Sequence, residues 1–298
     1  MKDEYPHFTL SHICRLLGIT RQSYYQHFWR LEDNTIEDDL VVQEVLKVKK
    51  NHRHMGGRKI YQKLQNFFLE HQIKMGRDAL FDLLSRHQLL VRRRKRRIQT
   101  TQSSHWLRKY PNLIENFIPT QSNQLWVSDI TYWKLSNSDV AYISLITDVY
   151  SHKIVGYHVA KSLSTMETIK ALKMAVSQNS DQLENLIHHS DRGVQYCSSP
   201  YVKFLEKRQI KISMTQNGDP YENAIAERIN GILKSEYLYD LEVTSLKEAK
   251  KHLKRVIDLY NQDRPHLSIG YLTPEVVHQS NVVTENLWKK NKLEQKYC

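Results

Sequence analysis

The chain has 298 residues, 40% of them hydrophobic, and its 44 Lys and Arg outnumber its 32 Asp and Glu, which gives a formal net charge of +12. This length predicts two domains with room for a smaller appendage. The positive charge favours a polyanionic partner, with nucleic acid the first candidate and a membrane surface the second. The apolar stretches are shorter than a spanning helix requires, and MKDEYPHFT is not a signal peptide. We therefore expect a cytoplasmic protein without membrane attachment.

Two further classes are disfavoured by missing motifs. The three cysteines, Cys14, Cys197 and Cys298, show no CxxC spacing, so neither a disulfide framework nor a zinc ribbon is indicated. No GxxxxGK[ST] loop occurs among the nine glycines, so the sequence offers no phosphate cradle for an ATP-driven motor.

The first segment, residues 1–35, has the pattern of a helix-turn-helix. Apolar residues at helical spacing precede Gly18, and Thr20 is placed to cap a second helix. Arg21 and Gln22 open that helix and are candidates to face DNA bases. An ordinary helical hairpin is an equally good interpretation of this segment alone.

Residues 36–97 predict a second helical domain that also resembles a helix-turn-helix. A helix over 36–51 is followed by two amphipathic stripes, which are Ile60, Leu64 and Phe67, then Leu80, Leu83 and Leu84. The domain ends in a basic run of Arg92, Arg93, Arg94, Lys95, Arg96 and Arg97. Such runs are usually solvated, but beside helix-turn-helix-like units this one is expected to grip DNA phosphates. Residues 98–122, which are polar in part, are expected to be a linker.

From residue 123 to 240 the pattern changes to strands alternating with helices. LWVSDITYWKL, VAYISLITDVY and KIVGYHVAKSL predict three consecutive antiparallel strands. A helix over 166–177, the strand LIHHSD, a helix over 201–207, the strand KISMTQ and a long helix from residue 223 follow. This order predicts a mixed α/β sheet with helices for both faces.

Three acids interrupt elements that are otherwise apolar or neutral: Asp129 in the first strand, Asp191 at the end of LIHHSD, and Glu227 in the last helix. In that helix Ile225, Ile229, Ile232 and Leu233 form a buried stripe, and Asn223, Glu227, Asn230 and Lys234 form a polar stripe about 160–200° away. The acid could bind a cation while the lysine reaches a phosphate. The alternative is a solvated helix face.

Carboxylates from two strands and a helix suit phosphodiester cleavage. In-line displacement is served by two divalent cations about 3.5–4 Å apart, which activate the attacking oxygen and stabilise the leaving oxygen. Mg²⁺ prefers carboxylates and water, so a few acids and the DNA phosphate suffice to hold it.

Five motif blocks resemble those of one family. They are WVSDITYW, ITDVYSHKIVGYHV, HHSDRGVQY, GDPYENAIAERINGILKSE and YNQDRPHLSIGYLTPE, with 35 residues (192 to 226) between Asp191 and Glu227 and with Lys234 seven residues further on. Over about residues 36 to 280 the chain resembles the DDE transposases of bacterial insertion sequences of the IS-three family, within the retroviral-integrase superfamily.

The resemblance implies a ribonuclease H-like catalytic core with a mixed five-stranded sheet, preceded by all-α domains. Asp129, Asp191 and Glu227 would hold two Mg²⁺ ions, for which Mn²⁺ can substitute. The implied activity is hydrolytic nicking at transposon ends and strand transfer by the freed 3′-hydroxyl, without ATP or a covalent protein intermediate. Implied partners are the terminal inverted repeats, target DNA and further copies of the chain in a synaptic dimer or larger multimer, on the bacterial nucleoid. Whether an upstream-frame partner protein or a frameshift fusion is involved stays open.

The resemblance also suggests supporting residues. Lys234, Arg228 and Asn223 are expected to contact DNA. His189 is expected to support the site, by contacting DNA or orienting the metals, although a packing role is as good an interpretation. Asp148 is a rival acid to which the resemblance assigns a supporting role.

The chain departs from the family and superfamily patterns at two points. Glu222 stands where the family commonly has aspartate, and the His-His-Cys-Cys zinc site of retroviral integrases is missing. The helices expected over 241–298, with a capping box at Ser245 and Glu248 and a helix start at Thr273–Pro274, would buttress the sheet.

Two other functions compete with an active transposase. One is a catalytically silent, sequence-specific DNA-binding regulator derived from such an element, against which the intact acids and Lys234 argue. The other is a stand-alone nuclease on RNA–DNA hybrids or junctions, which would not need the helix-turn-helix-like region.

Overall fold

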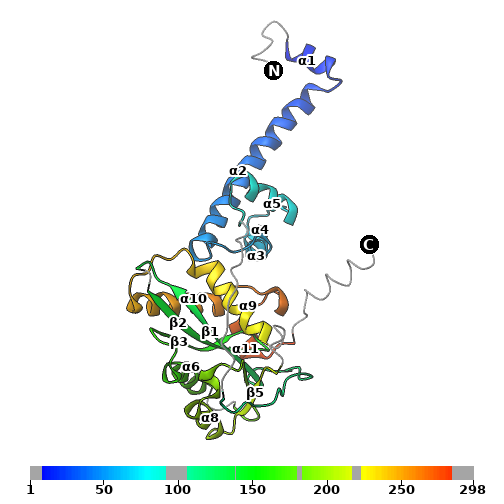
Figure 1. The fold of residues 1–298 in the computed structure, drawn as a ribbon. Helices are drawn as coiled ribbons and strands as arrows, with labels where there is room; N and C mark the ends of the chain where they lie inside the picture. The colour runs from blue at the N-terminus through cyan, green and yellow to red at the C-terminus, as the bar shows by residue number, and fades with distance from the viewer. Residues whose placement is uncertain (1–8, 92–105, 138, 180–182, 217–222, 284–298) are drawn as a thin grey trace. The chain divides into compact units, whose positions relative to one another are not determined.

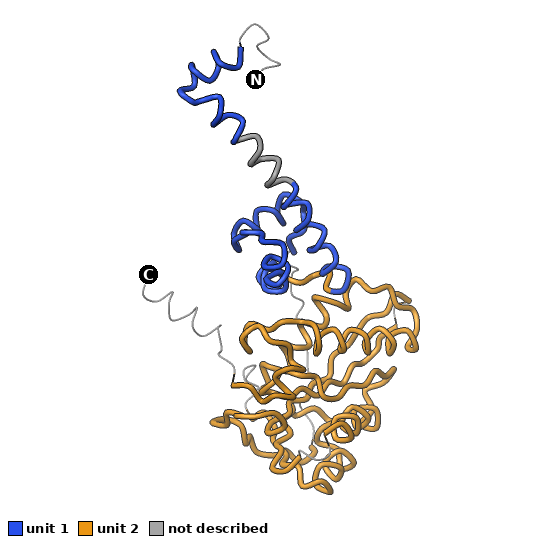
Figure 2. The backbone as a smooth tube through the Cα atoms, turned by 180° about the vertical axis from the view of Figure 1, so that it is seen from behind, with its two compact units in different colours: residues 1–51, 56–92 blue, residues 52–55, 93–298 orange. Residues whose placement is uncertain are grey.

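The computed structural model describes residues 9–91, 106–137, 139–179, 183–216 and 223–283, with the backbone alone for residues 27–35. The chain forms two compact units: Met1–Asn51 with Gly56–Arg92, and His52–Met55 with Arg93–Cys298 (Figure 2). In the described ranges no helix has the length and apolarity needed to cross a membrane.

The first unit is helical. It contains α1 (Leu10–Leu16), α2 (Arg21–Asn51), α3 (Gly57–Lys63), α4 (Gln65–Glu70) and α5 (Arg77–Arg86). Thr9 caps α1, Gly18 takes the left-handed φ of +67° in the turn, and the Thr20 hydroxyl accepts a hydrogen bond from the Ser23 amide at 3.0 Å. The predicted boundary at residue 35 falls inside α2. That helix continues for 31 residues because no proline or glycine interrupts it.

The apolar stripes of the first unit are buried largely as predicted. Ile60, Leu64, Leu80, Leu83 and Leu84 are buried, together with Val41 and Val45 of α2. In α4, however, Phe68 is buried instead of the predicted Phe67. The helix is interrupted at Leu64, between α3 and α4, so the helical periodicity counted from Ile60 does not continue into α4.

The second unit is built on a five-stranded sheet in the order β3-β2-β1-β4-β5 (Figure 1). Its strands are β1 (Leu125–Lys134), β2 (Val140–Asp148), β3 (Ile154–Ala160), β4 (Ile187–Ser190) and β5 (Lys211–Met214). β1, β2 and β3 pair antiparallel, whereas β4 and β5 run parallel to β1. The predicted mixed five-stranded sheet is confirmed.

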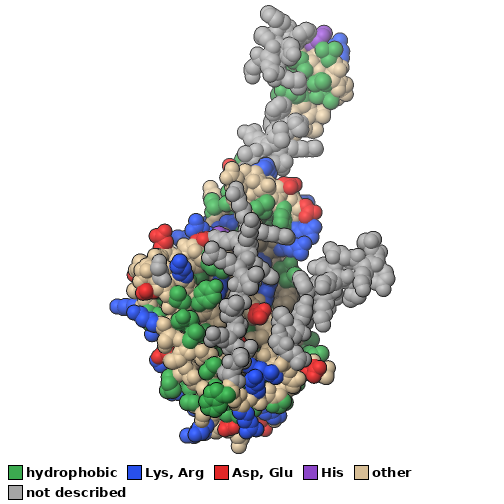
Figure 3. All heavy atoms as spheres, viewed as in Figure 1, with side chains coloured by type: hydrophobic (Ala, Val, Ile, Leu, Met, Phe, Trp, Pro, Cys, Tyr) green, Lys and Arg blue, Asp and Glu red, His purple; other side chains and the backbone are tan. Residues whose placement is uncertain are grey.

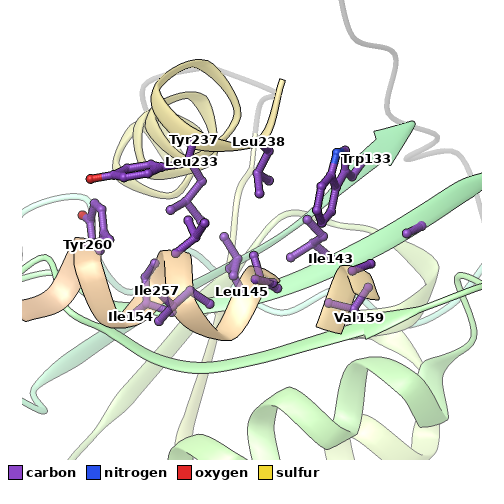
Figure 4. Packing of buried hydrophobic residues seen from close by; sticks show 14 of the residues in the cluster. Trp133, Ile143, Leu145, Ile154, Val159, Leu233, Tyr237, Leu238, Ile257 and Tyr260 are labelled. Atoms are coloured by element: carbon purple, nitrogen blue, oxygen red, sulfur yellow. The ribbon is translucent and has the colours of Figure 1, made fainter. Parts of the chain in front are cut away.

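Helices pack on both faces of the sheet, over two apolar clusters. On one face lie α6 (Thr165–Gln178), α7 (Val194–Cys197) and α8 (Ser199–Glu206). On the other lie α9 (Ala224–Ile232), the π-helix η3 (Leu233–Leu238) and α10 (Leu246–Gln262), as Figure 4 shows for part of this cluster. The chain then forms η4 (Leu267–Ile269) and α11 (Pro274–Ser280).

The helix α10 packs into the same hydrophobic core as the sheet. Leu253, Val256, Ile257 and Tyr260 are buried in the same cluster as Leu145 of β2 (Figure 4). The predicted capping box is present: the Ser245 hydroxyl accepts from the Glu248 amide at 3.3 Å, and the Glu248 carboxylate accepts from the Thr244 amide at 3.0 Å. Residues after 240 therefore close the hydrophobic core over one face of the sheet.

On the face drawn in Figure 3, Lys and Arg side chains occur over much of the second unit, with Asp and Glu between them.

The helix α6 packs closely on β3 at Gly156. A Cβ at this position would lie 2.7 Å from the Ala175 Cβ and would clash with the Ala171 carbonyl oxygen, whereas a Cβ at Gly231 of α9 would meet nothing within 4 Å. We expect Gly156→Ala to lower the free energy of unfolding by about 1–3 kcal/mol. The matched control Gly231→Ala should raise it by about 0.5–1 kcal/mol. Thermal unfolding followed by tryptophan fluorescence measures both; equal stability of Gly156→Ala and wild type would contradict the close approach.

Candidate active site

Asp129 is the acid at the centre of the site. It lies on β1, the middle strand, and its side chain is only partly accessible. Its Oδ2 accepts a hydrogen bond from Asn230 Nδ2 of α9 at 2.7 Å, and its Oδ1 accepts one from the Ile130 amide at 2.8 Å. The first of these bonds joins the strand to the helix that carries Glu227.

Asp191 lies beside Asp129 because of the strand register. Ser128 of β1 pairs with Ser190 of β4 in a parallel ladder. Each aspartate is the residue directly after the paired serine. Asp191 Oδ1 accepts a hydrogen bond from the Gly193 amide at 2.9 Å. A Cβ at Gly193 would stand 2.9 Å from the same oxygen, so the turn after β4 suits glycine.

Glu227 approaches from the first turn of α9, and its side chain is exposed. Burial and then the negative charge of Asp191 raise the pKa of Asp129 to about 7. Glu227 adds to this rise, while the hydrogen bonds from Asn230 and Ile130 oppose it. The sequence-predicted triad is thus gathered in one electrostatic environment.

The donor set fits a hard divalent cation. Within the described residues, no group of three or more His, Cys, Asp or Glu side chains is close enough to hold a metal by itself. Like charges repel without a cation between them, and Mg²⁺ typically takes one or two carboxylates and completes its shell with water and substrate phosphates. Asp129, Asp191 and Glu227 offer only carboxylate oxygens, the ligands that such an ion prefers.

Lys234 places a positive charge near Asp129. It lies on η3, and π-helical turns are frequent at functional sites. Its Nζ stands 4.2 Å from the centroid of the Tyr132 ring. Burial lowers the pKa of Lys234, and the charge of Asp129 opposes that effect.

The polar stripe of α9 is largely buried, so the alternative interpretation as a solvated helix face does not hold for most of it. Asn230 is 5% exposed and Asn223 is 7% exposed, and the buried helix face passes through Ala226 and Ile229 next to them. Asn223 Nδ2 donates to the Ser128 carbonyl oxygen at 3.2 Å. This buried bond gives Asn223 a structural role at the start of α9, and its predicted contact with DNA stays a prediction.

Both histidines of LIHHSD are fully buried. His188 Nε2 is hydrogen-bonded to the Ser128 hydroxyl at 2.7 Å and to the Tyr201 hydroxyl at 3.1 Å, and burial lowers the His188 pKa to about 3. His189 Nδ1 is hydrogen-bonded to the Ser213 hydroxyl of β5 at 2.8 Å. Of the roles open to His189, its burial favours packing.

Asp148, the rival acid, is also fully buried. It accepts hydrogen bonds from the Ser151 amide at 2.8 Å, the Ser151 hydroxyl at 2.6 Å and the Asn123 amide at 2.8 Å. These bonds hold the turn between β2 and β3, so the carboxylate is satisfied by the protein.

The other predicted DNA-contacting residues, besides Lys234 and Asn223, lie in three places. Arg228 is exposed on α9, and Arg21 and Gln22 are exposed at the start of α2 in the first unit. The basic run 92–97 lies outside the described residues, and so does Glu222, the departure from the family pattern. Asn230 was not singled out as a partner of Asp129, although its position three residues after Glu227 on the polar stripe was the available signal.

A mixed five-stranded sheet with acids beside one another on its central strands defines a ribonuclease H-like catalytic core. Two integrase core domain models match the chain, over residues 119–220 and 208–274. An insertion element IS600 protein of 31 kDa from Shigella sonnei is 34% identical over 266 residues, covering 88% of this chain and 96% of the relative. The transposase of IS629 from the same organism is 28% identical over 269 residues, covering 88% of each.

Among solved structures, the catalytic core domain of HTLV-2 integrase in complex with magnesium is 23% identical, with a TM-score of 0.43, and covers 53% of this chain and 97% of that one. This likeness is too weak to carry an argument. The sequence relatives are sufficient: the chain belongs to the insertion-sequence transposases of the IS-three family, which are enzymes with an integrase core domain.

The raised pKa of Asp129 predicts a pH-dependent stability without metal. In the folded protein this pKa is about 7 instead of 3.8, so between about pH 4 and pH 7 the unfolded chain loses a proton that the folded chain keeps, and stability falls as the pH rises through this window. Asp129→Asn removes the effect. A rise from 3.8 to about 7 corresponds to about 4 kcal/mol at most, so in chelator at pH 8 the variant should melt several degrees above wild type, and the difference should vanish near pH 4.

Asp258→Asn, on the exposed face of α10, is the matched control and should show no such pH-dependent difference. Melting curves of Asp129→Asn and wild type that coincide at every pH would contradict the raised pKa.

Proposed function

We propose that the chain cuts phosphodiester bonds at the ends of its insertion sequence and joins the freed 3′-hydroxyl to target DNA. Asp129, Asp191 and Glu227 would hold two Mg²⁺ ions, for which Mn²⁺ can substitute. The observation that carries the proposal is the register of β1 with β4, which sets Asp129 beside Asp191 under the helix that bears Glu227.

The protein's part in the reaction is to hold oxygen ligands in place. Asn230 fixes one oxygen of Asp129 by donating to it, and the Gly193 amide fixes one oxygen of Asp191. When bound, two divalent ions activate the attacking oxygen and stabilise the leaving oxygen. Asp129 must release its proton to bind a cation, and its pKa of about 7 makes that release easy at neutral pH.

Lys234 would hold the DNA at this place. Its ammonium lies near enough to Asp129 for their charges to interact, so it can neutralise a non-bridging phosphate oxygen beside the metal ligands. Arg228, exposed on α9, would contact the flanking DNA backbone.

DNA ends would be recognised by the first unit. α1, the Gly18 turn and the start of α2 have the order of a helix-turn-helix, and Arg21 and Gln22 are exposed where a recognition helix reads bases. The basic run 92–97 would add salt-sensitive phosphate contacts. Because two ends must be processed together, we propose a dimer or a larger synaptic multimer as the active form.

Glu227→Gln tests the catalytic role directly. On labelled DNA carrying the element's own ends, wild type with Mg²⁺ should give nicked and joined products, and none with chelator. The variant should lose about a hundredfold or more of this activity, because it removes one metal-binding charge worth several kcal/mol. Its affinity for the DNA ends should stay within about twofold of wild type, since the substitution does not alter the proposed DNA contacts of the first unit.

Glu184→Gln, an exposed acid before β4, is the matched control and should keep full activity. Tight, salt-sensitive binding of the ends without cleavage by wild type would instead support a catalytically silent regulator or a requirement for a partner polypeptide.

Lys234→Ala tests the phosphate contact. We expect about a tenfold slower joining, the loss of one charge-assisted contact worth about 1.5–3 kcal/mol at most, with a melting temperature close to that of wild type. Lys254→Ala, an exposed lysine of α10, should leave joining unchanged. If both variants join at the wild-type rate, Lys234 does not contact the reacting DNA.

A further inference from the structure

The strand β1 has an open edge next to the candidate active site. β4 pairs with β1 only from Leu125 to Ser128, whereas β2 pairs with β1 as far as Lys134. In the part of the chain that the structure describes, the segment from Asp129 to Lys134 is therefore hydrogen-bonded to a strand on one side alone. This edge begins at the acid that the proposed reaction needs.

Tyr132 stands on this edge, and its side chain is 45% exposed. Ile130 and Lys134, which lie on the same face of β1, are partly buried and exposed, so this face of the strand end is accessible. The apolar clusters on the two faces of the sheet do not include it. Packing of the core therefore does not explain a large aromatic side chain at this position.

The Tyr132 ring contacts the ammonium group of Lys234. Lys234 Nζ lies 4.2 Å from the ring centroid, within the range of a cation–π contact. The same ammonium interacts with the charge of Asp129. Tyr132 and Lys234 thus present an aromatic surface and a positive charge together, a combination that proteins use to hold single-stranded nucleic acid.

We propose that Tyr132 is a positioning residue whose ring stacks on a nucleobase of the DNA strand being cut or joined. This proposal rests on the proposed function and deepens it. Tyr132 lies three positions after Asp129, about 10 Å along the strand at roughly 3.3 Å per residue. The two side chains leave opposite faces of β1, so a DNA strand that touches both passes around the open edge, where Lys234 Nζ meets the Tyr132 ring. Nucleotides rise by about 3.4 Å each along one strand, so the stacked base would lie within about three nucleotides of the reacting phosphodiester.

Stacking would supply something that the metal ligands cannot. The carboxylates and Lys234 bind the phosphate, which leaves the strand free to rotate about its backbone. A base held against Tyr132 removes that freedom and so orients the 3′-hydroxyl, independently of which base it is, because every base has an aromatic face.

The test separates base stacking from a second possible role, in which the ring only holds Lys234. We would use a duplex carrying the inverted repeat that flanks this coding frame, with 2-aminopurine placed in turn at the three nucleotides nearest the reacting phosphodiester, and without target DNA. The proteins are full-length wild type, Tyr132→Phe, Tyr132→Leu and the control Tyr239→Leu, a tyrosine that is 59% exposed after η3.

We expect quenching of 2-aminopurine at one of the three positions by wild type, Tyr132→Phe and the control, and its loss with Tyr132→Leu. With target DNA added, Tyr132→Leu should join about tenfold more slowly, within the range of one base–aromatic stack. An abasic nucleotide at the quenched position should make wild type and Tyr132→Leu equally slow, because neither then has a base to stack.

Two results would overturn the proposal. In the first, Tyr132→Leu leaves the fluorescence unchanged and slows joining by the same factor on intact and abasic DNA, which assigns the ring to holding Lys234. In the second, Tyr132→Leu changes neither signal. If wild type joined no DNA at all, the proposed function would fail, but quenching in the binding experiment would still decide the role of Tyr132. Melting temperatures close to that of wild type confirm that each variant folds.

Discussion

The site depends on the hydrogen bond from Asn230 Nδ2 to Asp129 Oδ2, 2.7 Å long. A partly buried carboxylate on the central strand of a sheet is costly unless its oxygens are satisfied. Asn230 provides a donor without adding a charge, so it lowers that cost and leaves the negative charge available for a cation. Since Asn230 and Glu227 lie on the same helix, the bond that satisfies Asp129 also fixes where the third acid approaches it.

The rest of the second unit holds this arrangement in place. One apolar cluster packs α9, η3 and α10 on the sheet, so residues far beyond the three acids determine the position of Glu227 and Lys234. On the opposite face, the neutral imidazole of His188 is bonded to hydroxyls of Ser128 and Tyr201, which ties β4 to β1 just before Asp191. Packing thus keeps like charges close together, and a divalent cation would relieve their repulsion.

The strands and the three acids were predictable from the sequence, because period-2 apolar patterns mark strands and an acid inside such a pattern stands out. The pairing of β4 with β1 was not, since parallel register depends on contacts between distant segments. The burial of His189 follows from the position of β4 inside the sheet, and the role of Asn230 follows from the buried face of α9, which includes Ala226, Ile229 and Asn230. The continuity of α2 was not predicted, because a helix over 36–51 was counted as the start of a second domain, although the stretch 21–51 contains no proline or glycine.

Calorimetric titration of wild type with Mn²⁺ at pH 7, in two buffers of different ionisation enthalpy, tests most directly whether the three acids form a cation site. Because the Asp129 pKa is about 7, this carboxyl is partly protonated without metal, and binding should release protons to the buffer. Proton release that disappears in Asp129→Asn, together with weaker binding, is the predicted result. Equal Mn²⁺ binding by both proteins without proton release would contradict a cation site at these carboxylates.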